Sequence, residues 1–327
     1  MRYYVKIKKI IRVLLLAALF GITYSLFFTV YENIRVNNVI SNFVERANDT
    51  PSEVVELNLV SRGTYIRKYF EVPRETLNEK DGKNVFMDDE KTNIGQFGDF
   101  FVTPQSPFPT VFGFHQFMSY YYGGHAAIKS GEDELLEATG FPDFGNESLL
   151  GIIFSKGYKG HGYSPVATST DNYWMEPSTI HHYYNNFYRT RYMGLRAVNP
   201  FIETDNSEEL YNDYLEAAVN GAKQKIEDEA LYNFLFFLNM RRKYYCTDFV
   251  SRTFEEAFEK VVNNKLDYVS KGYAKKLNDD GFITSVNDLI LSRDTYLTFY
   301  VEINEEEYLG ETKIVENIYY LEDVEVI

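Results

Sequence analysis

The feature that most constrains this chain is an uncharged apolar run near its N-terminus. Residues 13–30 carry no charged side chain, and the basic residues that precede them are Arg2, Lys6, Lys8, Lys9 and Arg12. A helix over this run would be roughly 27 Å long at about 1.5 Å per residue, which matches the hydrocarbon core of a bilayer. The basic flank predicts a cytoplasmic N-terminus and export of the residues that follow.

A cleaved signal peptide would share the same basic flank. The small residues suited to cleavage, Ala17, Ala18 and Gly21, lie inside the apolar run, and no A-x-A-like site follows it. The sequence therefore favours an uncleaved signal-anchor over residues 1–33, in a single-pass protein of the cell membrane. Cleavage would give a secreted protein instead, so in both cases the bulk of the chain is extracytoplasmic.

The exported part is strongly acidic. The whole chain of 327 residues has 33 basic and 48 acidic side chains. Without the five basic residues of the N-terminal flank, 28 basic side chains face 48 acidic ones, a net charge of −20. Such a domain repels nucleic acid and anionic lipid headgroups, so no nucleic-acid partner is expected. Neutral and cationic substrates are compatible with this negative charge. The charge could equally serve only to keep the protein soluble.

The rest of the chain is interpreted as a lead-in followed by one α+β domain. Residues 34–93 are expected to form a stalk and lead-in, and residues 94–327 the domain itself. A stretch rich in Gly, Tyr and Asn at about 140–190 has weak periodicity and is interpreted as a long insertion. With 45% hydrophobic residues, the chain can bury one large core.

Periodicity predicts the main elements of that domain. Asp205 and Glu208 fit a capping box before one amphipathic helix, and a second helix is expected to begin at Cys246. Strand patterns occur at 98–103, 125–129, 134–139, 191–198, 296–302 and 313–327. Residues from 283 onward are read as strand-like.

Cys246 is the only cysteine and therefore cannot form an internal disulfide. An unpaired cysteine in an exported protein is either a buried packing residue or a functional residue. Cys246 lies where a strand-like segment passes into a helix. The amides of a first helical turn stabilise a thiolate and can also hold an oxyanion, which favours a nucleophile.

A nucleophilic thiol needs a proton acceptor. His125 begins a strongly patterned strand, and Gly123 and Gly124 before it permit close approach of other backbone or substrate. Glu137 on the next strand could orient the imidazole. Tyr245 could donate to the oxyanion or line the cleft. For each of these residues a structural role is the open alternative: a structural histidine, an ordinary strand carboxylate and a packed aromatic ring.

No metal or cofactor is expected. His161, His181 and His182 show no i, i+4 pair and no H-E-x-x-H spacing, and no glycine-rich phosphate loop precedes a helix. The aromatic run at 174–192 could form a wall that faces a carbohydrate or peptide, or equally the core of a loop.

Several short segments, in this order, resemble the YiiX/YebB-like permuted papain-like enzymes of the NlpC-type cell-wall peptidase superfamily. The segments are Gly98-Asp99, Gly124-His125-Ala126-Ala127-Ile128, Leu136-Glu137-Ala138, Leu195-Arg196, Tyr232-Asn233-Phe234, Tyr245-Cys246-Thr247-Asp248-Phe249-Val250, and Ile283-Thr284-Ser285-Val286-Asn287-Asp288-Leu289 with Ser292. No single motif is specific, but together they span roughly residues 94–300.

The resemblance implies a circularly permuted papain-like fold, with an antiparallel sheet packed on helices. The catalytic Cys, His and Glu of the family correspond to Cys246, His125 and Glu137. The implied chemistry is hydrolysis of an amide or ester through an acyl-enzyme, on a peptide, peptidoglycan or acyl-lipid substrate. Asp248 departs from the family, which commonly has a glutamate there, and is interpreted as surface variation.

Two rival functions remain open at this point. The protein could be a surface binding or scaffold protein on a degenerate papain-like fold, with the aromatic insertion as its functional surface. It could also be a thiol acyltransferase, which would use the same residues.

Overall fold

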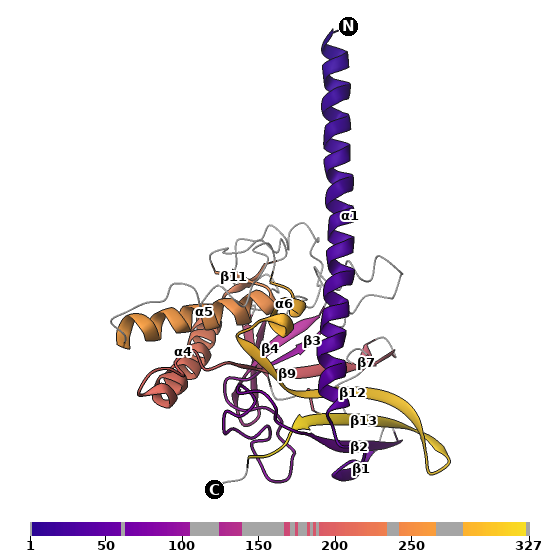
Figure 1. Cartoon of the computed structure of the whole chain (residues 1–327), viewed down its shortest axis with the longest axis vertical. Helices are drawn as coiled ribbons and strands as arrows, with labels where there is room; N and C mark the ends of the chain where they lie inside the picture. The colour runs from indigo at the N-terminus through magenta and orange to yellow at the C-terminus, as the bar shows by residue number, and fades with distance from the viewer. Residues whose placement is uncertain are drawn as a thin grey trace.

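The computed structural model describes residues 2–59, 63–104, 124–138, 167–170, 174–175, 182–183, 186–187, 190–233, 242–265 and 284–324. Its helices are α1 (Arg2–Glu45), α4 (Ser207–Glu227), α5 (Cys246–Lys265) and α6 (Val286–Leu291) (Figure 1). Its strands are β1 (Glu53–Leu59), β2 (Gly63–Val72), β3 (Phe100–Thr103), β4 (His125–Gly131), β5 (Glu134–Ala138), β6 (Ala167–Thr170), β7 (His182–Tyr183), β8 (Asn186–Phe187), β9 (Arg191–Ala197), β10 (Leu231–Tyr232), β11 (Lys243–Tyr244), β12 (Thr295–Tyr308) and β13 (Glu311–Leu321).

One large sheet organises the fold, with the strand order β1-β2-β13-β12-β9-β3-β4-β5-β6. Its pairs are antiparallel except β2 with β13, which run parallel. The α+β class is confirmed, but the sheet is mixed and not purely antiparallel as expected. The parallel pair joins segments from opposite ends of the chain, and no hairpin fixes their relative direction.

The helices α4 and α5 pack against each other beside β4 and β5. Their buried residues follow the predicted stripes, so both amphipathic helices are confirmed. The predicted capping box is wrong, because α4 begins at Ser207 and its N-cap Asn206 makes no side-chain capping bond. A true capping box occurs at α6, where Ser285 and Asp288 cap each other in a segment that was read as strand-like.

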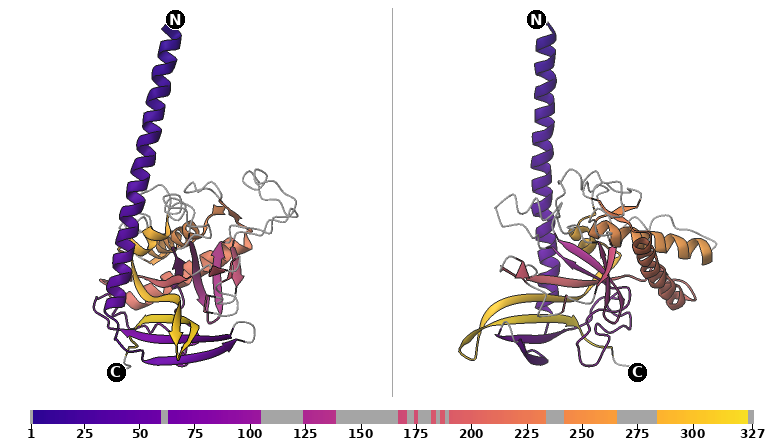
Figure 2. Two further views of the ribbon diagram at one scale, coloured as in Figure 1. Left: turned by 90° about the vertical axis from the view of Figure 1, so that its right-hand side faces the viewer. Right: turned by 180° about the vertical axis from the view of Figure 1, so that it is seen from behind.

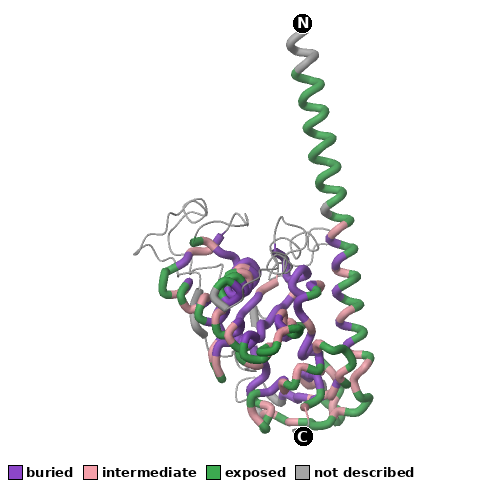
Figure 3. Tube along the Cα trace, turned by 60° about the vertical axis from the view of Figure 1, so that its left-hand side comes forward, coloured by how far each residue is buried: buried purple, intermediate pink, exposed green. Residues whose placement is uncertain are grey.

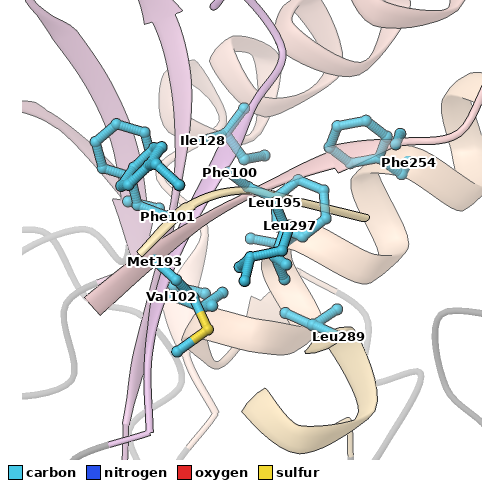
Figure 4. Close-up of a cluster of buried hydrophobic side chains, with 14 of the residues drawn as sticks. Phe100, Phe101, Val102, Ile128, Met193, Leu195, Phe254, Leu289 and Leu297 are labelled. Atoms are coloured by element: carbon cyan, nitrogen blue, oxygen red, sulfur yellow. The ribbon is translucent and has the colours of Figure 1, made fainter. Parts of the chain in front are cut away.

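The core fills the space between the sheet and the helices (Figure 4). Phe254 of α5 lies against Phe100 of β3 with ring centroids 5.4 Å apart. Gly194 of β9 makes room for Phe299 of β12, since an added Cβ would lie 2.0 Å from that ring. The first contact holds α5 against the central strands, and the second packs β9 closely on β12.

The first helix is continuous from the apolar run into the body of the protein. The apolar half of α1 is long enough and apolar enough to cross a membrane, which is consistent with an anchor or a signal sequence. It is exposed along its length, whereas one stripe of the second half is buried (Figure 3). That stripe consists of Thr29, Glu32, Val36, Ile40 and Phe43.

Residues 34–93 do not form a separate stalk. The helix continues to Glu45 while packed on the body, and residues 53–59 and 63–72 form β1 and β2 of the main sheet. The lead-in is therefore part of the folded unit, which differs from the expected boundary at residue 94. Residues 78–93 of this lead-in form an irregular loop without helix or strand.

Candidate functional site

The lone cysteine lies at the start of α5, as predicted. Cys246 is the first residue of the helix, and the amide of Phe249 donates to the carbonyl of Tyr245 at 2.8 Å to close the first turn. The amides of a first turn have no partner within their own helix, and they carry the positive end of the helix dipole. Cys246 is 8% exposed, so this residue is buried.

His125 is held at the first position of β4, opposite Thr103 of β3. Gly124 before it has a φ of +83°, and an added Cβ would lie 2.4 Å from the carbonyl oxygen of Thr103 and 2.8 Å from the side chain of Val286. Only glycine fits such a position. The close backbone approach expected from the glycine pair is confirmed at Gly124, while Gly123 lies outside the described residues.

Glu137 reaches His125 from the neighbouring strand β5. The register places Glu137 opposite Ala127, so it shares a face of the sheet with His125 two positions along β4. The His125 Nε2 and the Glu137 Oε2 are 2.6 Å apart. Glu137 is only 2% exposed, so this hydrogen bond is protected from water.

His125 interacts with both of its predicted partners. Burial lowers the pKa of the imidazole, but hydrogen bonds to Cys246 and Glu137 and the nearby negative charge raise that pKa to about 9. The ring therefore carries a proton at neutral pH. Folding brings the three side chains together from β4, β5 and α5.

Trp174 supports the imidazole, and the sequence reading assigned it no role at this site. Its indole stacks on His125 with ring centroids 5.9 Å apart and an interplanar angle of 12°. Trp174 is fully buried and packs edge-on against Phe101 and Tyr192. These two members of the aromatic run at 174–192 thus belong to the core. The available signal was that Trp174 is the only tryptophan in the chain.

Tyr245 is buried beside the cysteine, where its hydroxyl oxygen accepts a hydrogen bond from the amide of Thr284 at 2.8 Å. Thr247 donates in turn to the carbonyl of Thr284. Both contacts tie the start of α5 to the segment that enters α6. The role of Tyr245 as an oxyanion donor stays a prediction.

Asp248 is not a surface residue, so its interpretation as surface variation is wrong. It is completely buried in the first turn of α5, 3.5 Å from Arg252 Nη1. Burial raises the pKa of its carboxyl group to about 7, although Arg252 acts in the opposite direction. The first turn of α5 thus holds both the candidate nucleophile and a buried titratable carboxyl group.

The Gly98-Asp99 motif is structural. Gly98 has a φ of +85°, and Asp99 accepts a hydrogen bond from the amide of Gln96 at 2.8 Å. The carboxylate of Asp99 also accepts two bonds from Arg196, from Nε at 2.7 Å and from Nη2 at 3.0 Å. Asp99 thus closes a turn through its side chain and anchors Arg196 at the same time.

Of the other four histidines, only His182 lies among the described residues. His115, His161 and His181 lie outside the described residues, and His182 belongs to β7. Within the described ranges, no group of three or more His, Cys, Asp or Glu side chains could hold a metal ion. Most of the insertion at about 140–190 also lies outside these ranges.

Comparisons with protein-family models, curated proteins and solved structures found no match to this chain.

Proposed function

We propose that this protein is a membrane-anchored, extracytoplasmic cysteine hydrolase that cleaves an amide or ester bond through an acyl-enzyme at Cys246. The observation that carries the proposal is the position of His125, which hydrogen-bonds Glu137 at 2.6 Å and whose pKa is raised by the neighbouring Cys246 and Glu137, while Cys246 begins a helix. A nucleophile, a base and an orienting carboxylate in this relation form the general arrangement of a catalytic triad.

The proposed reaction has two halves. The Cys246 sulfur attacks the substrate carbonyl, and the C–N or C–O bond breaks as the leaving amine or alcohol takes a proton from the His125 imidazolium. Water then gives a proton to the neutral imidazole and attacks the thioester. The carboxylic acid leaves, and the sulfur and imidazole regain their shared proton. First-turn amides of α5 hold the oxyanion in both halves.

Glu137 and Trp174 position the imidazole in this scheme. Glu137 occupies Nε2, which leaves Nδ1 to face the thiol. A carboxylate in this place also stabilises the protonated ring. The stacked indole of Trp174 restricts rotation of the imidazole out of this alignment.

The proposed fold and localisation rest on coarser observations. The order of His125 before Cys246, with helices beside a sheet, supports a permuted papain-like fold. The unbroken α1 supports an uncleaved anchor, because its second half contributes Val36, Ile40 and Phe43 to the core. Positive residues before the apolar run support a cytoplasmic N-terminus.

The test compares alkylation and turnover in the full chain. We expect iodoacetamide to label Cys246 at pH 6 about 100-fold faster than an ordinary thiol, of which only about 0.3% is thiolate at that pH. Hydrolysis of peptidoglycan, of simple peptides or of lipid esters should disappear in Cys246→Ala. Labelling no faster than that of a free thiol, together with no hydrolysis, would favour the scaffold alternative. A transferred acyl group among the products would identify an acyltransferase.

A further inference from the structure

The position of the site relative to α1 bears on which substrates it can reach. The stripe of α1 from Thr29 to Phe43 is buried on the body, and it begins at the end of the apolar run 13–30. The folded unit therefore starts where the apolar run stops. In Figures 1 and 2, α6 and α5 lie on the side of the body nearer the exposed half of α1, and β1 and β2 lie on the far side.

A short chain of contacts connects this helix to the reacting groups. Helix α1 packs on α6, and a groove between them is lined by Val39 and Asn42 of α1 and by Ile290 and Leu291 of α6. At the other end of α6, Val286 lies against Gly124, which directly precedes His125. The six residues of α6 thus separate the docked part of α1 from the imidazole.

These contacts set the distance between the site and the membrane surface. From Val30 to Val39, α1 rises about 13 Å at about 1.5 Å per residue. The headgroup layer occupies roughly the first 5–8 Å beyond the hydrocarbon core on each side of a bilayer. A site next to α6 therefore lies at or just outside the headgroups. Since α1 is continuous and docked, the body cannot move away from the membrane on a loose tether.

The charge of the exported part adds a chemical restriction. Its net charge of −20 opposes a close approach to anionic headgroups. A substrate at this height is therefore expected to carry a neutral or zwitterionic headgroup.

We infer that the Cys246 site acts on membrane-anchored substrates whose scissile amide or ester carbonyl lies at the level of neutral or zwitterionic headgroups. The inference rests on the proposed function and narrows its substrate class, because a carbonyl distant from the bilayer surface would lie beyond the reach of a site fixed by α1. Free peptides in bulk solution are poorer substrates than their lipid-linked forms.

The test places a thiol reagent at the headgroup level. The full chain is reconstituted in phosphatidylcholine vesicles that contain a small fraction of headgroup-iodoacetylated phosphatidylethanolamine, and soluble iodoacetamide serves as the second probe. Cys246 is the only cysteine, so the mass of the chain reports its labelling without ambiguity. The variant carries about 18 helix-forming residues after Val30, which adds five full turns and raises the body by roughly 27 Å without rotating it.

We expect the lipid probe to label the wild-type chain about tenfold or more faster than the lengthened variant, because tethering sets the effective concentration of the reagent at the thiol. Soluble iodoacetamide should label both chains at the same rate, which shows that the insertion leaves the site intact. Equal labelling of both chains by the lipid probe would overturn the inference.

A different result would overturn the proposed function instead. If His125→Ala leaves the soluble-probe rate unchanged, the imidazole does not activate the thiol. The height of the site would then still be reported by the lipid probe. The two failures are therefore distinguishable in one set of samples.

Discussion

Two buried charged clusters lie on the same sheet, and they differ in how completely their groups are satisfied. Arg196 is 1% exposed, and it donates to Asp99 and Asp81 and to the carbonyl oxygens of Lys83 and Asn84. The side chain of His125 is 12% exposed. One partner of His125 is the carboxylate of Glu137 and the other is the thiol of Cys246.

This difference separates a structural cluster from a chemical one. The guanidinium of Arg196 is surrounded by protein acceptors, so no ligand can reach it without displacing them. The imidazole of His125 lies at the first residue of a strand and keeps part of its surface accessible, with the Cys246 thiol as one of its two neighbours. Buried charge alone therefore does not point to a functional site, whereas a titratable group next to a nucleophilic side chain makes a better candidate.

The largest expected effect is the loss of stability when the ion pair between Arg196 and Asp99 is broken. Arg196→Met should lower the free energy of unfolding by about 3–5 kcal/mol, because it leaves the buried Asp99 carboxylate without its ion pair. Urea unfolding measures the change. The double variant Arg196→Met, Asp99→Asn serves as the control and should recover part of the loss. If the single variant unfolds like the wild type, Arg196 does not hold the fold together.

The second-largest expected effect is slower alkylation of Cys246 when His125 is removed. His125→Ala should slow alkylation of Cys246 at pH 6 by about 100-fold, since an unassisted thiol is almost fully protonated there. Arg196→Met should alkylate at the wild-type rate under conditions in which it stays folded. Slow alkylation in both variants would erase the distinction between the two clusters.

Asp248 gives a pH-dependent effect on stability. Its pKa is raised by burial to about 7, so the folded state binds the proton more tightly than the unfolded state. The stability that this group contributes is present below about pH 4 and is lost as the pH rises to about 7. The free energy of unfolding of Asp248→Asn should therefore rise above that of the wild type across this pH window, by about 2 kcal/mol at pH 8.

Unfolding at pH 5 and pH 8 measures that gain. The matched control is Asp205→Asn at an exposed position, which should leave stability unchanged at both values. A constant difference between Asp248→Asn and the wild type at all pH values would contradict the assignment.

The smallest expected effect comes from Glu137→Gln. Glutamine keeps a hydrogen bond to His125 but removes the charge, so we expect an alkylation rate about tenfold lower and a lower His125 pKa. Proton NMR titration of the imidazole measures the second change. Glu134→Gln on the same strand, whose carboxylate instead meets Lys223, should change neither quantity. An unaltered His125 pKa in Glu137→Gln would remove the orienting role.

The sequence revealed the local parts of this molecule better than the long-range parts. The start of α5 at Cys246 and the hairpin of β4 and β5 follow from periodicity over short stretches. The pairing of β2 with β13 could not be predicted from the local sequence, because nothing near either strand specifies a partner more than two hundred residues away.

In the candidate site, too, local features were easier to predict from the sequence than long-range ones. His125 and Glu137 share a hairpin, so alternation along its strands placed them on one face. Trp174 and the burial of Asp248 were missed, since both depend on how distant elements pack around them. The capping box at Asp205 and Glu208 had the right spacing, but the chain begins its helix at Ser207 instead.

The parallel pair of β2 and β13 has a consequence for biosynthesis. The hairpin of β1 and β2 is translated early, yet the strand that joins it to the sheet ends at Leu321. A lone two-stranded hairpin is marginal in water. Until β13 is synthesised, β2 has only β1 as a partner, and the arrival of β13 joins this hairpin to the rest of the sheet.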